Sequence, residues 1–338
     1  RIEGIRTTGD TKDDPAVGVT GYPPTSMLLC RNWWEMGVRR GDYVAWSAFT
    51  LRGDGMIDTF RHLGATVVPF DHHPDQFARL AALSHGLRPV TLYCLSEPML
   101  NAIPSSCARL ELDPAAVFAS YRSMAFAGEV LTPRLRQLAA GWGVELFHQG
   151  PLGDVGMTFE CRAHDGVHVW EDGTFVEVVD PATGAPVPDG ARGEMVVTSL
   201  DDPLTPRLRF RTGDLIEMVP TPCPCGRTHA RFHRLGRTGD EVVIHGRSIM
   251  PWDLQDLVAE HPETAGGLFQ IVRRQREDDT LRLRIGLADA SVADGAARDR
   301  IYDALQAALD LPLAIEFVAA TDFRHLDPPH ALPRVAPQ

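Results

Sequence analysis

Short apolar runs alternate with helical patterns through about the first 150 residues, and this alternation constrains the fold more than any other feature. Each run is long enough for one strand, and the patterns between the runs place apolar residues at helical spacing. The runs are 43–49, 64–70 and 89–95, the helical patterns are 24–40, 53–63 and 74–84, and a further helix-and-strand unit covers 114–147. Parallel strands need long crossover connections, which are usually helices. The sequence therefore predicts an α/β fold with mostly parallel sheets and right-handed crossovers.

The pattern changes after Arg237, where a strand, a turn and a helix are predicted over 241–263. Further strands are predicted at 267–275, 280–288 and 313–320, and a helix at Asp294–Leu309. Two helices on one face of a small antiparallel sheet make an α+β lid. We therefore expect a large α/β N-terminal domain over 1–235 and a small α+β C-terminal lid domain over 236–338.

Composition excludes two classes of partner. The chain has 338 residues and a formal net charge of −12, whereas nucleic-acid binding relies on clustered Lys and Arg. It holds no run of 18 or more apolar residues, so no membrane-spanning helix is expected. No signal peptide pattern follows Arg1, and a cytoplasmic location is therefore predicted.

Three cysteines and a histidine form a candidate metal site. Cys161 and His168 flank a predicted hairpin, and Cys223 and Cys225 follow about 55 residues later. Three thiols and an imidazole from two turns suit a closed, structural zinc site, with His164 as an alternative ligand and a packed His168 as the alternative interpretation. A disulfide is disfavoured in a reducing compartment. The other cysteines, which lie in apolar stretches and are expected in the core, are Cys30, Cys94 and Cys107.

The stretch 193–246 is dense in turn motifs: FRTGD at 210–214, CPCGR at 223–227 and GRTGD at 236–240. Together these motifs resemble the adenylate-forming superfamily and, within it, the phenylacetate-CoA ligase family. In that family the aspartate of the first motif binds the ribose hydroxyls of ATP, and Asp214 is its match. A carboxylate suits this role because it accepts two hydrogen bonds from a vicinal diol.

The resemblance implies further nucleotide contacts. The matching positions in the phosphate loop, the adenine-side segment and the third motif are Thr7, Thr8, Gly9, Thr11, Glu129 and Arg237. Asp13 stands where the loop lysine belongs and Asp14 replaces a proline, and carboxylates repel phosphate. Glu129 has a second interpretation, as a glutamate favoured near a helix N-terminus. Since the family carries further sequence before this loop, an N-terminal part of its large domain is expected to be missing here.

The family's Tyr-Gly-Leu-Ser/Thr-Glu motif corresponds to residues 147–151, which read FHQGP. Pro151 cannot supply the magnesium-binding carboxylate, and Asp154 is a candidate substitute. His148 places a titratable ring where the family has glycine. It either acts as a new general base or fills space in the pocket.

The lid lysine of the family is also replaced. The best match to its segment puts Ala331 at that position, and Lys12 is the only lysine in the chain. Arg334 is a candidate cation for the site, although a planar fork does not substitute for an ammonium group. Gly239 stands at the hinge position. Use of ATP or AMP and Mg²⁺ is therefore left open.

Three functions follow. The first is a phenylacetate-CoA ligase-like enzyme that joins an acyl or aryl acid to CoA, a carrier protein or an amine, in biosynthesis. The second is an ATP-independent acyl transferase or cyclase acting on a preactivated thioester. The third is a noncatalytic homologue that serves as a partner subunit. The expected ligand is a small-molecule acyl group, and a homodimer is one option for the assembly.

Overall fold

The structure is a computed structural model that describes residues 4–7, 17–20, 27–46, 54–70, 77–127, 131–152, 156–200, 206–264, 267–287, 295–323 and 334–337. The chain divides into two units. The first comprises Arg1–Leu95, Ala102–Ala127 and Ala139–Arg234, and the second Ser96–Asn101, Gly128–Leu138 and Leu235–Gln338. The domain boundary after residue 235 stays a prediction.

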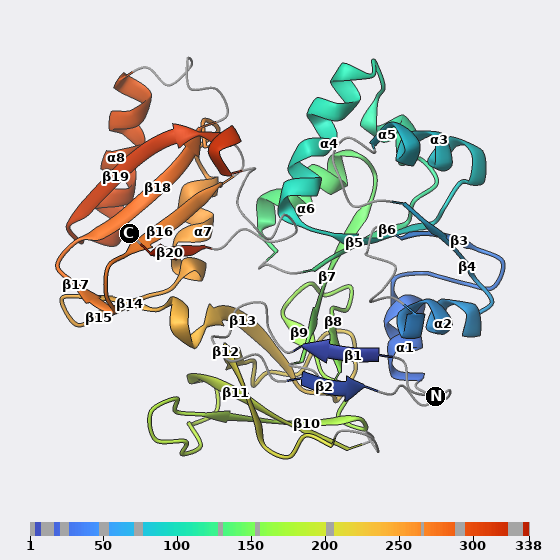
Figure 1. The fold of residues 1–338 in the computed structure, drawn as a ribbon, viewed down its shortest axis with the longest axis horizontal. Helices are drawn as coiled ribbons and strands as arrows, with labels where there is room; N and C mark the ends of the chain where they lie inside the picture. The colour runs from blue at the N-terminus through green and yellow to red at the C-terminus, as the bar shows by residue number, and fades with distance from the viewer. Residues whose placement is uncertain are drawn as a thin grey trace. The chain divides into compact units, whose positions relative to one another are not determined.

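The first unit is built on an 11-stranded sheet, counted over the described residues, in the order β10-β11-β12-β13-β9-β8-β7-β6-β5-β3-β4 (Figure 1). Its parallel part consists of β4 (Thr66–Pro69), β3 (Tyr43–Trp46), β5 (Thr91–Leu95), β6 (Ser123–Phe126) and β7 (Glu145–Pro151). Every neighbouring pair within this part is parallel. The predicted α/β class is confirmed.

The rest of this sheet is largely antiparallel. It consists of β8 (Met157–Phe159), β9 (Val167–His168), β13 (Arg231–Arg237), β12 (Phe210–Met218), β11 (Arg192–Ser199) and β10 (Thr174–Val179). The pairs β7·β8, β8·β9, β9·β13, β11·β12 and β10·β11 are antiparallel. Among the described residues, no crossover helix lies between successive strands of this part, and antiparallel pairing permits such direct connections.

Helices alternate with the parallel strands along the chain. They are α1 (Met27–Glu35), α2 (Asp54–His62), α3 (Phe77–Leu87), α4 (Glu97–Arg109), α5 (Pro114–Val117) and α6 (Pro133–Gly141). The pattern predicted the first helix over 24–40, but α1 ends sooner, because Gly37 adopts a φ of 92° that terminates the helix. Residues 24–26 lie outside the described part.

Aromatic side chains join α1 and α2 to the parallel strands. Trp33 of α1 stacks on Phe60 of α2 with ring centroids 4.3 Å apart, and Trp46 of β3 lies 4.5 Å from Tyr93 of β5. All four side chains are buried, whereas the neighbouring Trp34 is 52% exposed. Burial of these large rings supplies much of the stability of this part of the core.

A separate hairpin pairs β1 (Gly4–Thr7) with β2 (Val17–Thr20), and Thr7 lies opposite Val17. The strand that the resemblance implied at 17–20 is confirmed. The residues that connect the two strands, including Thr8, Gly9 and Thr11, lie outside the described residues.

The second unit carries two small sheets. One contains β15 (Arg247–Ile249), β14 (Val242–Ile244) and β17 (Glu277–Asp278), and the other β19 (Leu313–Ala319), β18 (Leu281–Leu287), β16 (Phe269–Arg273) and β20 (Val335–Pro337). Its helices are α7 (Pro251–Ala259) and α8 (Gly295–Leu309), with short 3-10 turns at η3 (Thr238–Asp240) and η4 (Ala320–Phe323). Apolar residues of both helices and both sheets form one core.

The expectation of an antiparallel sheet in this unit is wrong in part. The β16·β18 pair is antiparallel, but β18·β19 and β16·β20 are parallel. The helix α8 connects β18 to β19 and returns the chain to the same end of the sheet, so these two strands run in the same direction.

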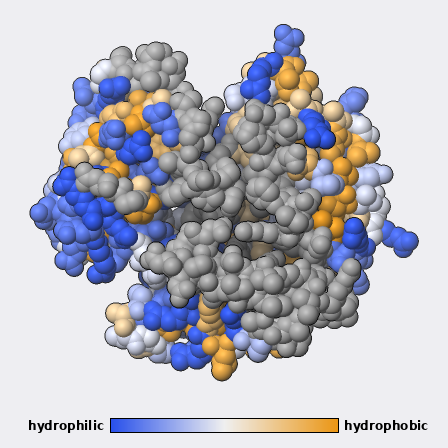
Figure 2. Space-filling model, in the orientation of Figure 1, coloured by the Kyte–Doolittle hydropathy of each residue, from blue (hydrophilic) through white to orange (hydrophobic). Residues whose placement is uncertain are grey.

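None of the helices in the described ranges is long and apolar enough to cross a bilayer. The face in Figure 2 mixes hydrophilic and hydrophobic side chains over the described residues. Phe175 at β10, Leu200 after β11 and Leu208 before β12 are exposed, and Leu208 reaches 81%.

Candidate nucleotide site and metal centre

The Thr-Gly-Asp turn of the first motif is a bulge in β12. Arg211 pairs with Val196 of β11 and Leu215 pairs with Glu194, so three residues of β12 lie opposite Met195 alone. Extra residues of this kind bend a strand and redirect a side chain. The φ of 75° at Gly213 explains why glycine occupies the centre of the turn.

Buried hydrogen bonds fix this bulge. The Thr212 hydroxyl donates to the Met195 carbonyl at 2.9 Å and accepts from the Asp214 backbone N–H at 3.1 Å. The buried Glu194 carboxylate accepts from the Gly213 N–H at 3.2 Å and from the Arg211 Nε at 2.9 Å. These hydrogen bonds therefore fix the backbone of residues 212–214, from which the Asp214 side chain extends.

Arg234 of β13 brings a positive charge to Asp214. Its Nη1 lies 3.5 Å from Asp214 Oδ2, and the two side chains are only 15% and 10% exposed. The same guanidinium lies against Gly150 at the end of β7, where a Cβ would come within 3.2 Å of the arginine Cζ. Three segments distant in sequence therefore meet at this point.

His148 lies on β7 beside Phe126, the last residue of β6, with ring centroids 6.1 Å apart. Its backbone N–H donates to Glu160 Oε2 at 2.8 Å, and the residue is 9% exposed. Ligands of open α/β sheets bind outside the carboxyl ends of the parallel strands. The sequence placed His148 after a strand that ends at Phe147, whereas β7 continues to Pro151 and His148 lies within it, opposite the end of β6. The role of His148 stays a prediction.

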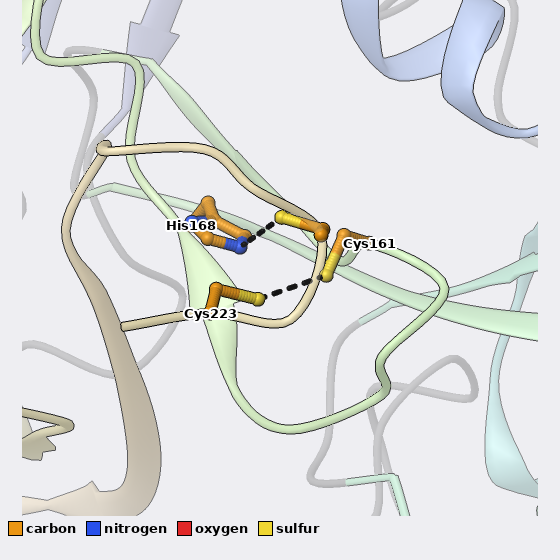
Figure 3. Close-up of side chains that lie close together, drawn as sticks. Cys161, His168 and Cys223 are labelled. Atoms are coloured by element: carbon orange, nitrogen blue, oxygen red, sulfur yellow. Dashed lines mark hydrogen bonds between the residues drawn. The ribbon is translucent and has the colours of Figure 1, made fainter. Parts of the chain in front are cut away.

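The four predicted metal ligands converge, and Figure 3 shows three of them, Cys161, His168 and Cys223, turned toward one another. The sulfur atoms of Cys161, Cys223 and Cys225 and a ring nitrogen of His168 all lie within 4.8 Å of one another. Cys161 Sγ is 3.6 Å from Cys223 Sγ, well beyond the ~2 Å of a disulfide, and Cys225 Sγ is 3.6 Å from His168 Nε2. This donor set and spacing can hold a metal ion.

Neighbouring groups and burial influence the tautomer and the protonation of two of these ligands. His168 Nδ1 donates to the His229 carbonyl at 2.9 Å, so its Nε2 can carry the lone pair toward the thiols. Burial lowers the pKa of His168, which favours the neutral, ligating ring. Burial also raises the pKa of Cys161 to about 12. A bound cation would therefore have to displace the proton of that thiol.

The alternative ligand His164 has other partners. Its Nε2 lies 3.1 Å from Glu145 Oε1 and its Nδ1 lies 3.1 Å from Glu160 Oε2. Glu160 also accepts from His148, so this pair of carboxylates links the hairpin beside the thiols to β7. The geometry favours His168 over His164 as the fourth ligand.

No family model matches the sequence. A phenylacetate-CoA ligase from Thermus thermophilus is 31% identical over 233 residues, which are 67% of this chain and 51% of that protein. One from Aromatoleum evansii is 29% identical over 290 residues, which are 82% of this chain and 64% of that protein. The chain thus spans about half to two thirds of the length of these relatives.

A crystal structure of 2-hydroxyisobutyryl-CoA ligase in complex with 2-HIB-AMP matches all of this chain and 74% of that chain, with 25% identity and a TM-score of 0.85. The chain is phenylacetate-CoA ligase-like and belongs to the adenylate-forming superfamily. An anthranilate CoA ligase in complex with anthranoyl-AMP, at 16% identity and a TM-score of 0.73, shares the fold.

The structure describes some of the other residues that the resemblance singled out in this phenylacetate-CoA ligase-like chain. Thr7 ends β1, and Glu129 and Asp154 lie outside the described residues. Arg237 ends β13, and its backbone N–H donates to Asp240 Oδ2 at 3.1 Å. Arg334 pairs with the buried Glu97 and donates to the carbonyls of Gly267 and Phe269. The roles of these residues stay predictions.

Sequence reasoning did not single out Arg234, Glu194 or Glu160. Glu194 could have been found from the sequence, because it directly follows Gly193, where the motif-rich stretch 193–246 begins. Arg234 and Glu160 could not have been found in this way, since their partners are 20 and 12 residues away and the pairings depend on how the strands are aligned.

Proposed function

We propose that this chain binds the adenylate part of an acyl-AMP and takes part in joining a small carboxylic acid to CoA. The observation that carries this proposal is the fixed bulge that presents Asp214, a match for the ribose-binding aspartate, beside Arg234 and the end of β7. Relatives named phenylacetate-CoA ligase and the matched CoA ligase bound to 2-HIB-AMP support the same reaction class. A biosynthetic acid, with CoA or a carrier protein as acceptor, is part of the proposal.

We further propose that the ligand set Cys161, His168, Cys223 and Cys225 holds structural zinc. Four donors from one imidazole and three thiols fill a tetrahedral coordination sphere, which leaves no position for a reacting water. Free thiols at this site agree with a reducing, cytoplasmic setting. The zinc would therefore stabilise the strands around it.

AMP should bind this protein more tightly than ATP with Mg²⁺. The Asp214 carboxylate can hold the ribose of either nucleotide, but Asp13 and Asp14 near the phosphate loop disfavour a triphosphate. Pro151 moreover replaces the magnesium-binding carboxylate of the family. Isothermal titration calorimetry with AMP, ATP and ATP plus Mg²⁺ measures the difference, and Asp214→Asn should weaken all three.

A reversed order of affinity, with micromolar ATP·Mg²⁺ binding and brisk acid-dependent pyrophosphate exchange, would restore the ordinary ligase mechanism. Titration of the same protein with an acyl-CoA further distinguishes the ligase from an ATP-independent acyl transferase. Tight acyl-CoA binding without any nucleotide binding would favour the second candidate.

That second candidate is acyl transfer from a preactivated thioester without ATP. The observation in its favour is His148, a buried imidazole beside the end of β6, where an acyl carbonyl would approach the parallel strands. A neutral imidazole there could remove a proton from an acceptor without metal or nucleotide.

A further inference from the structure

We infer that Arg234 is an anion-binding residue, and that its guanidinium takes the 5′-phosphate of a nucleoside monophosphate whose ribose Asp214 holds. This inference rests on the proposed function, because it assigns a further residue to the nucleotide site. Ala331 stands at the position that matches the family's lid lysine, and Arg234 would supply positive charge that this position does not.

The absence of a side chain at Gly150 leaves room for the guanidinium of Arg234. A Cβ at residue 150 would lie 3.2 Å from the Arg234 Cζ, 3.3 Å from Nη2 and 3.4 Å from Nε. These separations are shorter than the ~3.5–4.0 Å at which carbon atoms pack comfortably. The family has a serine or threonine here, so the missing side chain leaves space that the guanidinium occupies.

Asp214 can serve the ribose and the arginine together. A carboxylate has two oxygens with about four acceptor sites, and the contact of Arg234 Nη1 with Oδ2, at 3.5 Å, uses one of them. The 5′-phosphate of a nucleotide is separated from its ribose by one methylene. A phosphate attached to a diol held by Asp214 is thus close enough for a guanidinium anchored on that same carboxylate.

The planar fork of arginine suits this ligand, because two parallel N–H groups match two phosphate oxygens. The side chain is 15% exposed, so solvent screens the charge less than at an open surface. A phosphate on the 3′-hydroxyl would instead abolish the diol and meet the Asp214 carboxylate. The geometry therefore selects a 5′-phosphate.

The test compares the affinities of 5′-AMP, 3′-AMP and adenosine by calorimetry. Wild-type protein should prefer 5′-AMP over adenosine, and Arg234→Gln should lower 5′-AMP affinity by about tenfold to a hundredfold while leaving adenosine unchanged. The matched control is Arg192→Gln, which removes an exposed guanidinium paired with Glu217 on the same sheet and should keep the preference. Melting curves check that each variant is folded.

Gly150→Ala is an independent arm, since its methyl group would lie 3.2–3.4 Å from three guanidinium atoms and so crowd that group without removing it. It should reduce the preference for 5′-AMP in the same direction. If wild type binds neither adenosine nor 5′-AMP, the proposed nucleotide site fails and this inference fails with it. If wild type prefers 5′-AMP and folded Arg234→Gln retains that preference, or if 3′-AMP binds as tightly as 5′-AMP, the assignment of Arg234 is wrong while the proposed function stands.

Discussion

Replacing Cys223 with serine should abolish the proposed zinc binding and lower the melting temperature by about 10 °C, while chemistry at the nucleotide site changes less. Cys223 is one of four donors within 4.8 Å, and these come from separate segments around β8, β9 and the turn before β13. A metal that joins such segments contributes its binding energy to folding. Each kcal/mol lost shifts the melting temperature by about 2–4 °C in a domain of roughly this size.

Elemental analysis of protein prepared without chelators should find about one zinc per chain. The matched control is Cys107→Ser, which changes another buried thiol that is not part of the cluster and should keep the metal. Metal-free wild-type protein would show that the cluster is only a group of packed thiols and a histidine, and a Cys223→Ser variant with full metal content would show that the metal does not depend on this ligand set.

Replacing His148 with alanine should lower turnover of an acyl thioester by about a hundredfold or more, if the second candidate function is correct. The His148 imidazole lies beside Phe126, at the carboxyl end of β6. Alanine at position 148 has no group that can accept a proton. Steady-state turnover without added nucleotide is the measurement. Because the His148 contact to Glu160 uses the backbone N–H, the variant keeps that hydrogen bond.

His85→Ala provides the control, since His85 is an exposed histidine in the last turn of α3. Both variants should keep their metal content and a cooperative unfolding transition well above the assay temperature, which separates a catalytic loss from an unfolded protein. Full activity in His148→Ala, or a strict requirement for ATP in the wild type, would leave His148 as a side chain that only fills the pocket.

Much of the fold follows from local pattern. Apolar runs at strand length and helical spacing between them predicted β3 to β5 and the helices α1 to α3, because these periodicities depend on neighbouring residues alone. The pattern did not predict α4, which holds Pro104 in its interior, a position where proline disfavours a helix. It failed as well for the pairing direction of β18·β19, which depends on the crossover through α8.

The candidate site divides in the same way. The FRTGD run and the Cys/His set are short motifs, so the sequence by itself singled out Asp214 and the four residues of the Cys/His cluster. The contact of Arg234 with Gly150 could be seen only in the tertiary structure, because the two residues are far apart in the chain. The same holds for the pairing of His164 with Glu145 and Glu160. Such contacts follow from which strands are neighbours in the sheet, and a sequence pattern records the period of a strand but not its neighbours.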